Sequence, residues 1–450
     1  MSISKLNQIE TPGLFPITAE ITEDGYLIIG GCNTATLSKQ YGTPLYIIDK
    51  KTFCENSNAY INSLKKHLNN FLVLYAGKAF SNTAIFTIAD KLGLGLDVVS
   101  GGEIYTAIKT KVDLSKIYFH GNNKSQDEIE FAIKSSVGRI VCDNYHELNL
   151  LNETAKKHNK KIDILIRLTP GIECHTHEYI KTGHLDSKFG FDLEYYDDVL
   201  SLIKNKYKNL NLIGLHSHIG SQIFELIPFE DTIKVLFEHF KIAKDKYGIE
   251  LKELNIGGGL GISYIKEEDP PTVEKWAITI ANTIKTNAQK HKLLIPKLIC
   301  EPGRSLIANS GITLYRVGSI KEVPNERKFI SVDGGMADNP RPITYQAKYT
   351  AVVANKMLEK KDLETVTIAG RYCETGDILI KDITLPKLTH GDLIAVLSTG
   401  AYNYSMSSNY NMVPRPACIL VENGKSEIII ERETFEDITK THKMPKDLIS

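Results

Sequence analysis

Eight short apolar runs alternate with amphipathic stretches between Pro44 and about Arg304, and this rhythm constrains the fold more than any other feature of the chain. Several runs are continuously apolar, as expected of parallel strands that are covered on both faces. The stretches between them, such as residues 125–135 and 146–158, have helical spacing. The runs are Phe71–Tyr75, Leu96–Val99, Ile117–His120, Arg139–Cys142, Asp163–Leu168, Leu212–His218, Leu254–Ile256 and Lys297–Cys300. The pattern predicts an α/β protein with a (β/α)8 barrel of the TIM type.

The pattern changes after Arg304, where strand-like runs follow one another without long helices between them. These runs are residues 329–332, 365–369, 392–397 and 417–421, and residues 20–29 before the barrel have the same character. A second, β-rich domain that uses both ends of the chain is therefore expected. We assign residues 43–315 to the barrel domain, and residues 1–42 together with 316–450 to the β-rich domain.

Charge and cysteine content narrow the class of partner and the compartment. The 54 basic residues equal the 54 acidic ones, so the composition does not indicate the broad positive potential that binding to nucleic acid or to an anionic membrane surface requires. The seven cysteines are scattered and form no C-x-x-C pair, which favours a reducing compartment and disfavours structural zinc. No apolar run reaches the roughly 18 residues of a membrane span. We expect a cytoplasmic protein that acts on a small molecule.

Residues with reactive or ligand-binding side chains lie at or near the ends of six of the eight runs, where the open face of such a barrel would be. They are Lys78, Asp97, Arg167, His218, the glycines at 257–259 and the segment Glu301-Pro302-Gly303-Arg304. A lysine after an apolar strand is usually a solvated loop charge. At a barrel mouth, desolvation can turn it into an amine nucleophile for an aldehyde. The convergence of six strand ends favours the second interpretation of Lys78.

Glycines and an arginine near the last two strand ends indicate a phosphate site. Exposed backbone N–H groups at Gly257–Gly259 would be joined by Gly303, Arg304 and the hydroxyl of Ser221. A tight turn is the alternative for the glycines. The chain contains no G-x-x-x-x-G-K-[ST] segment, so a small phosphorylated cofactor is favoured over a nucleoside triphosphate.

Two further residues fit a pyridine ring. Glu301, if it points inward, could keep a pyridine nitrogen protonated, and the alternative is a surface carboxylate paired with Arg304. His218 could lie against the ring, and the alternative is a buried histidine satisfied by hydrogen bonds.

Five motifs in this order resemble fold-type III pyridoxal-phosphate decarboxylases, most closely the group that decarboxylates diaminopimelate. The motifs are Tyr75-Ala76-Gly77-Lys78-Ala79, residues 216–222, residues 257–261, residues 301–304 and Cys373-Glu374-Thr375-Gly376-Asp377. The resemblance runs from about Thr43 to Asp437, and the tail beyond it is unmatched. It implies an alanine-racemase-like barrel followed by a β-rich domain, which agrees with the strand pattern.

The resemblance also implies roles for the cofactor-site residues. Lys78 would carry pyridoxal 5'-phosphate as a Schiff base, and Glu301 would contact the pyridine nitrogen. His218 would stack on the ring. The residues around the phosphate would be Ser221, Gly259, Gly303, Arg304 and Tyr402.

The carboxyl-terminal half implies a substrate with a second charged centre. Arg304, Arg341 and Tyr345 would hold its distal carboxylate, a task that suits the planar fork of arginine. Glu374 would receive the distal ammonium group, and Tyr402 would also contact substrate. Loop and interface roles are the alternatives for Arg341 and Tyr345.

Cys373 would protonate the carbanion after carbon dioxide leaves. In the family its segment reaches the active site of the partner subunit, which implies a homodimer with shared sites. The implied reaction converts meso-2,6-diaminopimelate to L-lysine and CO2, the last step of lysine biosynthesis by the diaminopimelate route.

The compact segment Cys174-His175-Thr176-His177-Glu178 contains metal-binding residue types, but their spacing is too compressed for a usual tetrahedral set. We predict no metal. Two alternatives to the implied function remain. One is a decarboxylase of another amino acid, such as ornithine, arginine or a siderophore or antibiotic intermediate. The other is a non-catalytic regulator that binds the cofactor.

Overall fold

The computed structural model describes residues 4–5, 13–172 and 187–448, and it divides into two compact units. One unit comprises residues 54–262 and 269–306 and is the barrel unit. The other comprises residues 1–53, 263–268 and 307–450 and is the β-rich unit. In the described part of the chain, no helix combines the length and the apolarity needed to cross a membrane.

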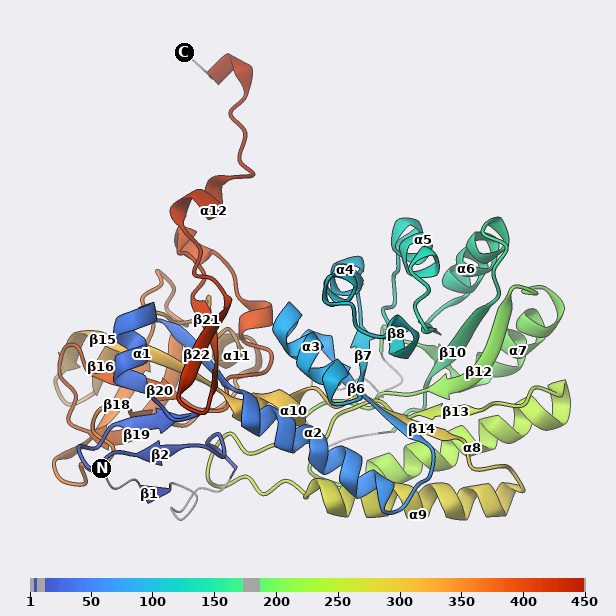
Figure 1. Ribbon diagram of the computed structural model, residues 1–450, viewed down its shortest axis with the longest axis horizontal. Coiled ribbons are helices and arrows are strands. Elements are labelled where there is room, and N and C mark those ends of the chain that lie inside the picture. Colours follow the sequence, from blue (N-terminus) through green and yellow to red (C-terminus); the bar gives the residue numbers. More distant parts are fainter. Residues whose placement is uncertain (1–3, 6–12, 173–186, 449–450) are drawn as a thin grey trace. The chain divides into compact units, whose positions relative to one another are not determined.

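The barrel unit contains a closed ring of eight parallel strands (Figure 1), in the order β10-β12-β13-β14-β6-β7-β8-β9 and back to β10. All eight strands expected from the apolar runs are confirmed. They are β6 (Phe71–Ala76), β7 (Gly95–Val98), β8 (Ile117–Phe119), β9 (Arg139–Cys142), β10 (Ile162–Thr169), β12 (Leu210–His216), β13 (Glu253–Asn255) and β14 (Lys297–Cys300). A short strand, β11 (Phe191–Asp192), pairs with the end of β10.

Helices lie outside these strands, as Figure 1 shows. They are α2 (Lys50–Lys65), α3 (Thr83–Lys91), α4 (Gly101–Thr110), α5 (Gln126–Lys134), α6 (Tyr145–Lys157), α7 (Tyr196–Asn205), α8 (Ile227–Tyr247), α9 (Val273–His291) and the short α10 (Arg304–Ile307). The side chains of Asn82, Ser100, Ser125 and Asn144 each accept a backbone N–H in the first turn of α3, α4, α5 and α6. These N-caps fix where each helix begins and keep the preceding loop short.

The interior of the barrel is a packed core. Leu74, Tyr118, Val141, Leu165, Ile213 and Ile299, from six different strands, form one buried cluster. Filling by large side chains is what gives such a barrel a solid centre, so ligands must bind at its ends.

The β-rich unit has a sheet in the order β19-β18-β16-β15-β5-β21-β22, to which β20 and β17 are joined through β15. The strands are β5 (Leu45–Asp49), β15 (Gly311–Val323), β16 (Arg327–Val332), β17 (Ala351–Val353), β18 (Leu363–Ala369), β19 (Ile378–Pro386), β20 (Leu393–Val396), β21 (Ala417–Glu422) and β22 (Lys425–Ile430). A small sheet of β1 (Ser4–Lys5), β2 (Glu20–Ile21), β3 (Leu27–Ile29) and β4 (Cys32–Asn33) precedes α1 (Thr34–Tyr41). The later helices α11 (Arg341–Tyr345) and α12 (Phe435–Thr439) are short.

Strand β5 shows why the amino-terminal end of the chain belongs with this sheet. It lies in the range 43–315 that the sequence suggests for the barrel domain, yet it pairs antiparallel with β15 and parallel with β21. All five of its residues are buried, and Leu45 and Ile47 join a core cluster with Ile312 and Ile419. Burial of these side chains therefore fixes β5 in the β-rich sheet.

Asp338 is a buried carboxyl in the β-rich unit. It accepts hydrogen bonds from the Tyr315 hydroxyl at 2.5 Å, from the Gly335 N–H at 3.0 Å and from the Tyr372 hydroxyl at 3.3 Å. Burial raises the pKa of Asp338 to about 7 despite these donors. In the unfolded chain the pKa of an aspartate is about 3.9.

This difference predicts a pH effect on stability. A carboxyl with a raised folded pKa stabilises the fold fully below about pH 4, and the contribution is lost as the pH rises through about 7. The melting temperature of Asp338→Asn, relative to wild type, should therefore rise by several degrees between pH 5 and pH 8. Scanning calorimetry measures it, and Asp24→Asn, at an exposed position, is the control. A relative melting temperature that is flat across this range would contradict the assignment.

Candidate functional site

Every strand of the barrel places a polar side chain at or just beyond its carboxyl end. In strand order from β6 to β14 these residues are Lys78, Asp97, His120, Asp143, Arg167, His216, Asn255 and Glu301. Seven of them are buried, the exception being Lys78, whose side chain is 41% exposed. Buried polar groups are costly unless they are paired, so this ring is a functional site candidate on physical grounds.

Lys78 lies in a 3-10 turn, η2 (Gly77–Ala79), directly after β6. Its Nζ is 3.0 Å from Oδ2 of Asp97, whose side chain is fully buried in β7. The carboxylate holds the lysine nitrogen at the barrel mouth.

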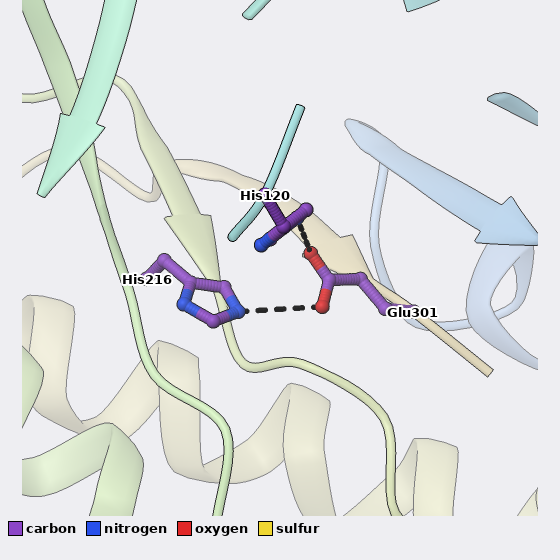
Figure 2. Close-up of side chains that lie close together, drawn as sticks. All are labelled: His120, His216 and Glu301. Carbon is purple, nitrogen blue, oxygen red and sulfur yellow. Dashed lines mark hydrogen bonds and ion pairs between the residues drawn. The ribbon is translucent and has the colours of Figure 1, made fainter. Parts of the chain in front are cut away.

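Glu301 follows β14 and is surrounded by donors (Figure 2). Oε1 accepts from Nδ2 of Asn255 at 2.6 Å and lies 2.8 Å from Nε2 of His120, and Oε2 lies 3.3 Å from Nε2 of His216. Burial opposes ionisation of Glu301, but the two histidines hold its pKa well below its usual range. The alternative of a surface carboxylate paired with Arg304 is wrong, because Glu301 is only 4% exposed and its contacts are these three side chains.

The two histidines of the motif at residues 216–218 lie at the same end of the barrel. Burial lowers the pKa of His216 to about 4, against the opposing effect of Glu301. Burial, followed by the charges of Lys78 and Arg167, also lowers the pKa of His218 well below its usual range. Nδ1 of His218 accepts the N–H of Gly258 at 3.3 Å. Burial therefore favours the neutral form of both rings, in which a ring contacts a ligand without adding charge.

Arg304 and Ser221 lie together beside the glycine loop. The Ser221 hydroxyl oxygen accepts from Nε of Arg304 at 3.2 Å and from Nη2 at 2.9 Å. The N–H of Ile223 donates to the carbonyl oxygen of Gly259 at 2.9 Å, which ties the two loops together. A guanidinium, a hydroxyl and glycine backbone in one place are suited to bind a phosphate.

At three of these positions a side chain would overlap neighbouring atoms, so glycine is required. A Cβ on Gly258 would lie 2.3 Å from the carbonyl oxygen of Glu301, and one on Gly259 would lie 2.6 Å from that of Gly220. A Cβ on Gly257 would lie 2.7 Å from Nδ1 of His218. The loop can approach its neighbours only because side chains are absent.

Gly257 and Gly248 offer a matched test of this crowding. Both have φ of +67°, but a Cβ on Gly248 would meet nothing within 4 Å. Gly248→Ala should cost about 1 kcal/mol for the left-handed backbone alone. Gly257→Ala should cost about 3 kcal/mol because steric overlap is added. The fluorescence of Trp276, the single tryptophan and a buried residue of α9, reports unfolding in denaturant. Equal losses would show that the overlap relaxes freely.

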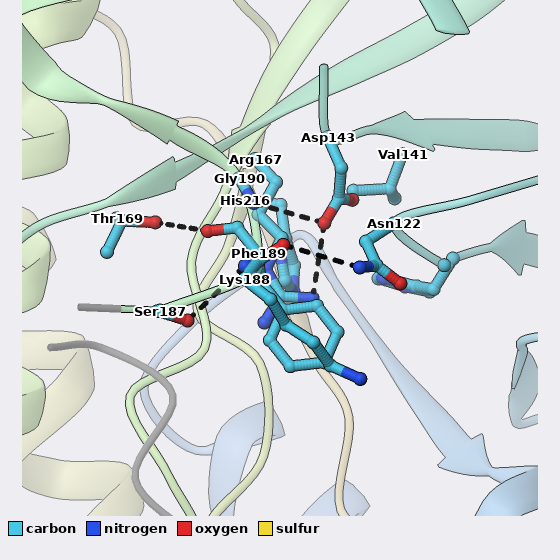
Figure 3. A network of polar contacts seen from close by, with 12 residues as sticks. Asn122, Val141, Asp143, Arg167, Thr169, Ser187, Lys188, Phe189, Gly190 and His216 are labelled. Carbon is cyan, nitrogen blue, oxygen red and sulfur yellow. Dashed lines mark hydrogen bonds and ion pairs between the residues drawn. The ribbon is translucent and has the colours of Figure 1, made fainter. Parts of the chain in front are cut away.

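Arg167 and Asp143 form a second network at the barrel mouth (Figure 3). Their side chains approach to 3.8 Å, and the Arg167 guanidinium lies 4.3 Å from the centre of the Phe189 ring. The N–H of Gly190 donates to Asp143 at 3.1 Å. This network anchors residues 187–190 to the barrel. The segment Cys174–Glu178, for which the sequence predicts no metal site, lies outside the described residues.

In the β-rich unit, Arg341 is a buried cation held by aromatic rings. Its guanidinium lies 4.7 Å from the centre of the Tyr264 ring and 5.5 Å from that of Tyr349, and Nη1 donates to the Tyr349 hydroxyl at 2.6 Å. Among the described residues, no carboxylate forms an ion pair with Arg341. A buried guanidinium of this kind is a prepared site for an anion.

The remaining predicted residues of this unit are more exposed. Tyr345 ends α11 and is partly exposed, and Cys373 and Glu374 are exposed. Tyr402 is partly buried with a φ of +59°, an unusual backbone conformation for a tyrosine. The N–H of Cys373 donates to Oδ1 of Asn411 at 2.9 Å.

Asp377 ties the loop of Cys373 to the loop that leads to Arg341. Its carboxylate accepts the N–H of Met336 at 2.6 Å and the N–H of Tyr372 at 2.8 Å. Two predicted substrate-binding segments are thus fixed to each other by one side chain within this unit.

Five further residues complete these sites, although no motif in the sequence marks them: His120, Asn255, Asp143, Tyr264 and Tyr349. His120 is the last residue of the third apolar run, and a polar side chain at the end of a predicted strand is the sequence feature that could have indicated its role. Asp97 and Arg167 were noted at strand ends but assigned no task.

Comparisons with known proteins place the chain. Residues 56–308 match the family described as "Pyridoxal-dependent decarboxylase, pyridoxal binding domain". The diaminopimelate decarboxylase of Synechocystis is 48% identical over 446 residues, which cover 97% of this chain and 94% of that protein. The Bacillus subtilis diaminopimelate decarboxylase is 45% identical, with 94% and 96% covered.

A solved structure agrees with these relatives. The diaminopimelate decarboxylase of M. jannaschii in complex with L-lysine superposes with a TM-score of 0.90 at 37% identity, covering 97% of this chain and 100% of that one. The family match spans more than half of the chain, and the relatives align over nearly its whole length. The chain therefore belongs to the diaminopimelate decarboxylase family of pyridoxal-dependent decarboxylases.

Proposed function

We propose that this chain decarboxylates meso-2,6-diaminopimelate to L-lysine and CO2 with pyridoxal 5'-phosphate, the last step of lysine biosynthesis by the diaminopimelate route. The observation that carries the proposal is the barrel-mouth cluster, in which Lys78 and Glu301 lie among buried polar groups of a chain that aligns end to end with diaminopimelate decarboxylases.

The barrel mouth fits the cofactor. Among the described residues, Oδ1 of Asp97, Nδ1 of His216 and Oγ of Ser217 are buried without a hydrogen-bond partner. Orphaned buried polar atoms are costly, and they favour a polar ligand at this place. When bound, pyridoxal phosphate supplies a ring that accepts the electrons released with CO2.

The protein's contribution at the cofactor is attachment, charge and orientation. Lys78 would attach the cofactor, with Asp97 beside its nitrogen. Glu301 stays ionised and would hold a proton on the pyridine nitrogen. The neutral ring of His218 would contact the cofactor ring. Ser221, Gly259, Gly303, Arg304 and Tyr402 would bind the phosphate.

The substrate's far end would be bound by charge complementarity. Arg341, together with Tyr345 and Arg304, would hold the distal carboxylate, which supplies the anion that Arg341 lacks among the described residues. Glu374 would hold the distal ammonium group, and Tyr402 would contact the substrate. These two charges would separate diaminopimelate from ornithine and arginine, which carry no distal carboxylate.

Cys373 would deliver the proton that replaces the lost carboxylate. Its exposed loop suits a residue that completes a site in another subunit, so a homodimer with shared active sites is part of the proposal. We further propose a cytoplasmic location, no metal, and no nucleic-acid or membrane partner.

Carbon dioxide release tests the function directly. Purified protein with cofactor should release CO2 from meso-diaminopimelate and not from ornithine or arginine. Turnover of ornithine or arginine in place of diaminopimelate would overturn the substrate assignment and leave the cofactor assignment standing. A cofactor-loaded protein that turns over none of the three would indicate a non-catalytic role.

A further inference from the structure

One imidazole lies between two of the carboxylates of the barrel mouth, Asp97 and Glu301. His120 follows β8, and its Nε2 is 2.8 Å from Oε1 of Glu301 and 3.7 Å from Oδ1 of Asp97. All three side chains are at most 6% exposed. The other oxygen of Asp97 accepts from Lys78 at 3.0 Å. A line of contacts therefore runs from Lys78 through Asp97 and His120 to Glu301.

The arrangement gives His120 a choice of partner. Nε2 of an imidazole carries at most one hydrogen, so it can donate to only one carboxylate at a time. Glu301 has other donors, namely Asn255 at 2.6 Å and His216 at 3.3 Å. Oδ1 of Asp97, in contrast, is buried without a hydrogen-bond partner among the described residues, and so is Nε2 of His120 despite its distance of 2.8 Å to Glu301. A small shift of the His120 ring would satisfy Oδ1 of Asp97.

We propose that His120 is a positioning residue that couples Glu301 to the Asp97–Lys78 pair, so that the charge at one end of the cofactor site sets the charge felt at the other. The inference rests on the proposed function of the barrel mouth. A donor placed on Asp97 reduces the negative charge that reaches the lysine nitrogen. A donor placed on Glu301 leaves that charge at full strength.

His216 provides an internal comparison. Its ring packs edge-on against His120 with centres 4.8 Å apart, it is equally buried, and its Nε2 contacts Oε2 of Glu301 (Figure 2). Among the described residues, no ion pair or hydrogen bond joins His216 to Asp97. Loss of His216 removes a contact to Glu301, whereas loss of His120 removes an imidazole that lies within 4 Å of both Asp97 and Glu301.

The titratable and charged groups around His120 come from every neighbouring strand end. They are Asp97 from β7, Arg167 from β10, His216 from β12 and Glu301 after β14, with Lys78 one contact farther away and Asp143 paired to Arg167. Because several of these groups can affect one another, the coupling is measured at Lys78, where the proposed effect ends. The measured quantity is the pH at which the absorbance of the lysine-attached cofactor changes.

The test compares His120→Ala, His120→Gln and His216→Ala in the cofactor-loaded protein. In the cofactor-loaded wild-type protein, the proposed coupling has Nε2 of His120 donate to Asp97. His120→Ala removes this donor, so Asp97 acts on the lysine nitrogen at full charge. The midpoint of the absorbance titration should therefore move to higher pH, and kcat should fall about 10-fold or more with little change in KM. In His120→Gln, an amide donor stands near the place of Nε2, and most of kcat should return. In His216→Ala, the midpoint should stay near that of wild type.

Equal midpoints in wild type and His120→Ala, or equal shifts in His120→Ala and His216→Ala, would overturn the coupling. If His120→Ala does not retain the cofactor, His120→Leu, which fills the place of the ring without a donor, is measured instead, and a midpoint equal to that of wild type would overturn the coupling. Failure of the proposed function looks different, because the wild-type protein would then show no lysine-dependent absorbance or no CO2 release.

Discussion

Replacing Lys78 by alanine should abolish the visible absorbance of the cofactor-loaded protein and reduce CO2 release by at least about 10³-fold. Among the described residues at the strand ends of the barrel, Lys78 is the only lysine, and its Nζ is fixed by Asp97 at 3.0 Å. Alanine removes the amine to which the cofactor aldehyde would attach, and no neighbouring strand end can replace it. The absorbance spectrum and steady-state CO2 release from meso-diaminopimelate measure the two effects.

The matched control is Lys234→Ala. Lys234 is half exposed on α8 and pairs with Asp231 at 2.8 Å, an exposed i,i+3 contact worth little. Its substitution should leave both readouts unchanged. Retention of the visible band in Lys78→Ala would refute the attachment of the cofactor through this residue.

The barrel could be predicted from the sequence because its signal is local. A strand such as β6 is a continuous apolar run followed by helical spacing, so the run itself indicates the strand. Strand β5 has the same local pattern. Its place in the β-rich sheet depends on pairing with β15 and β21, far away in the chain. Pairing between distant segments is not encoded in the composition of one run.

The site was predictable to the extent that its residues follow strands. Lys78 and Glu301 have motifs around them, whereas His120 and Asn255 are single polar residues whose meaning comes from distances to Glu301. The aromatic environment of Arg341 was equally hidden. Tyr264 lies 77 positions before Arg341 in the chain, and only folding brings its ring to the guanidinium.

Replacing Arg341 by alanine should reduce kcat/KM for meso-diaminopimelate by about 10²- to 10³-fold, because truncating one partner of a buried, hydrogen-bonded charge pair costs about 3 to 4 kcal/mol. Arg341→Lys should recover only part of the loss, since a lysine keeps the charge but lacks the planar fork. Tyr349→Phe should have a smaller effect of about 10-fold, because the ring under the guanidinium stays and one hydrogen bond is removed. Arg415→Ala, which breaks a partly exposed pair with Glu433, is the control with no expected effect on catalysis.

Inhibition by two product-like molecules identifies which group Arg341 binds. L-Lysine retains the distal carboxylate of diaminopimelate, whereas 1,5-diaminopentane has the same carbon chain and both amines without any carboxylate. In Arg341→Ala, inhibition by L-lysine should weaken about as much as kcat/KM falls, and inhibition by 1,5-diaminopentane should stay near that of wild type. Equally weakened inhibition by both molecules would show that Arg341 supports the fold of the site and does not bind the carboxylate. Because the guanidinium is buried against Tyr264 and Tyr349 without a carboxylate among the described residues, selective weakening is the expected result.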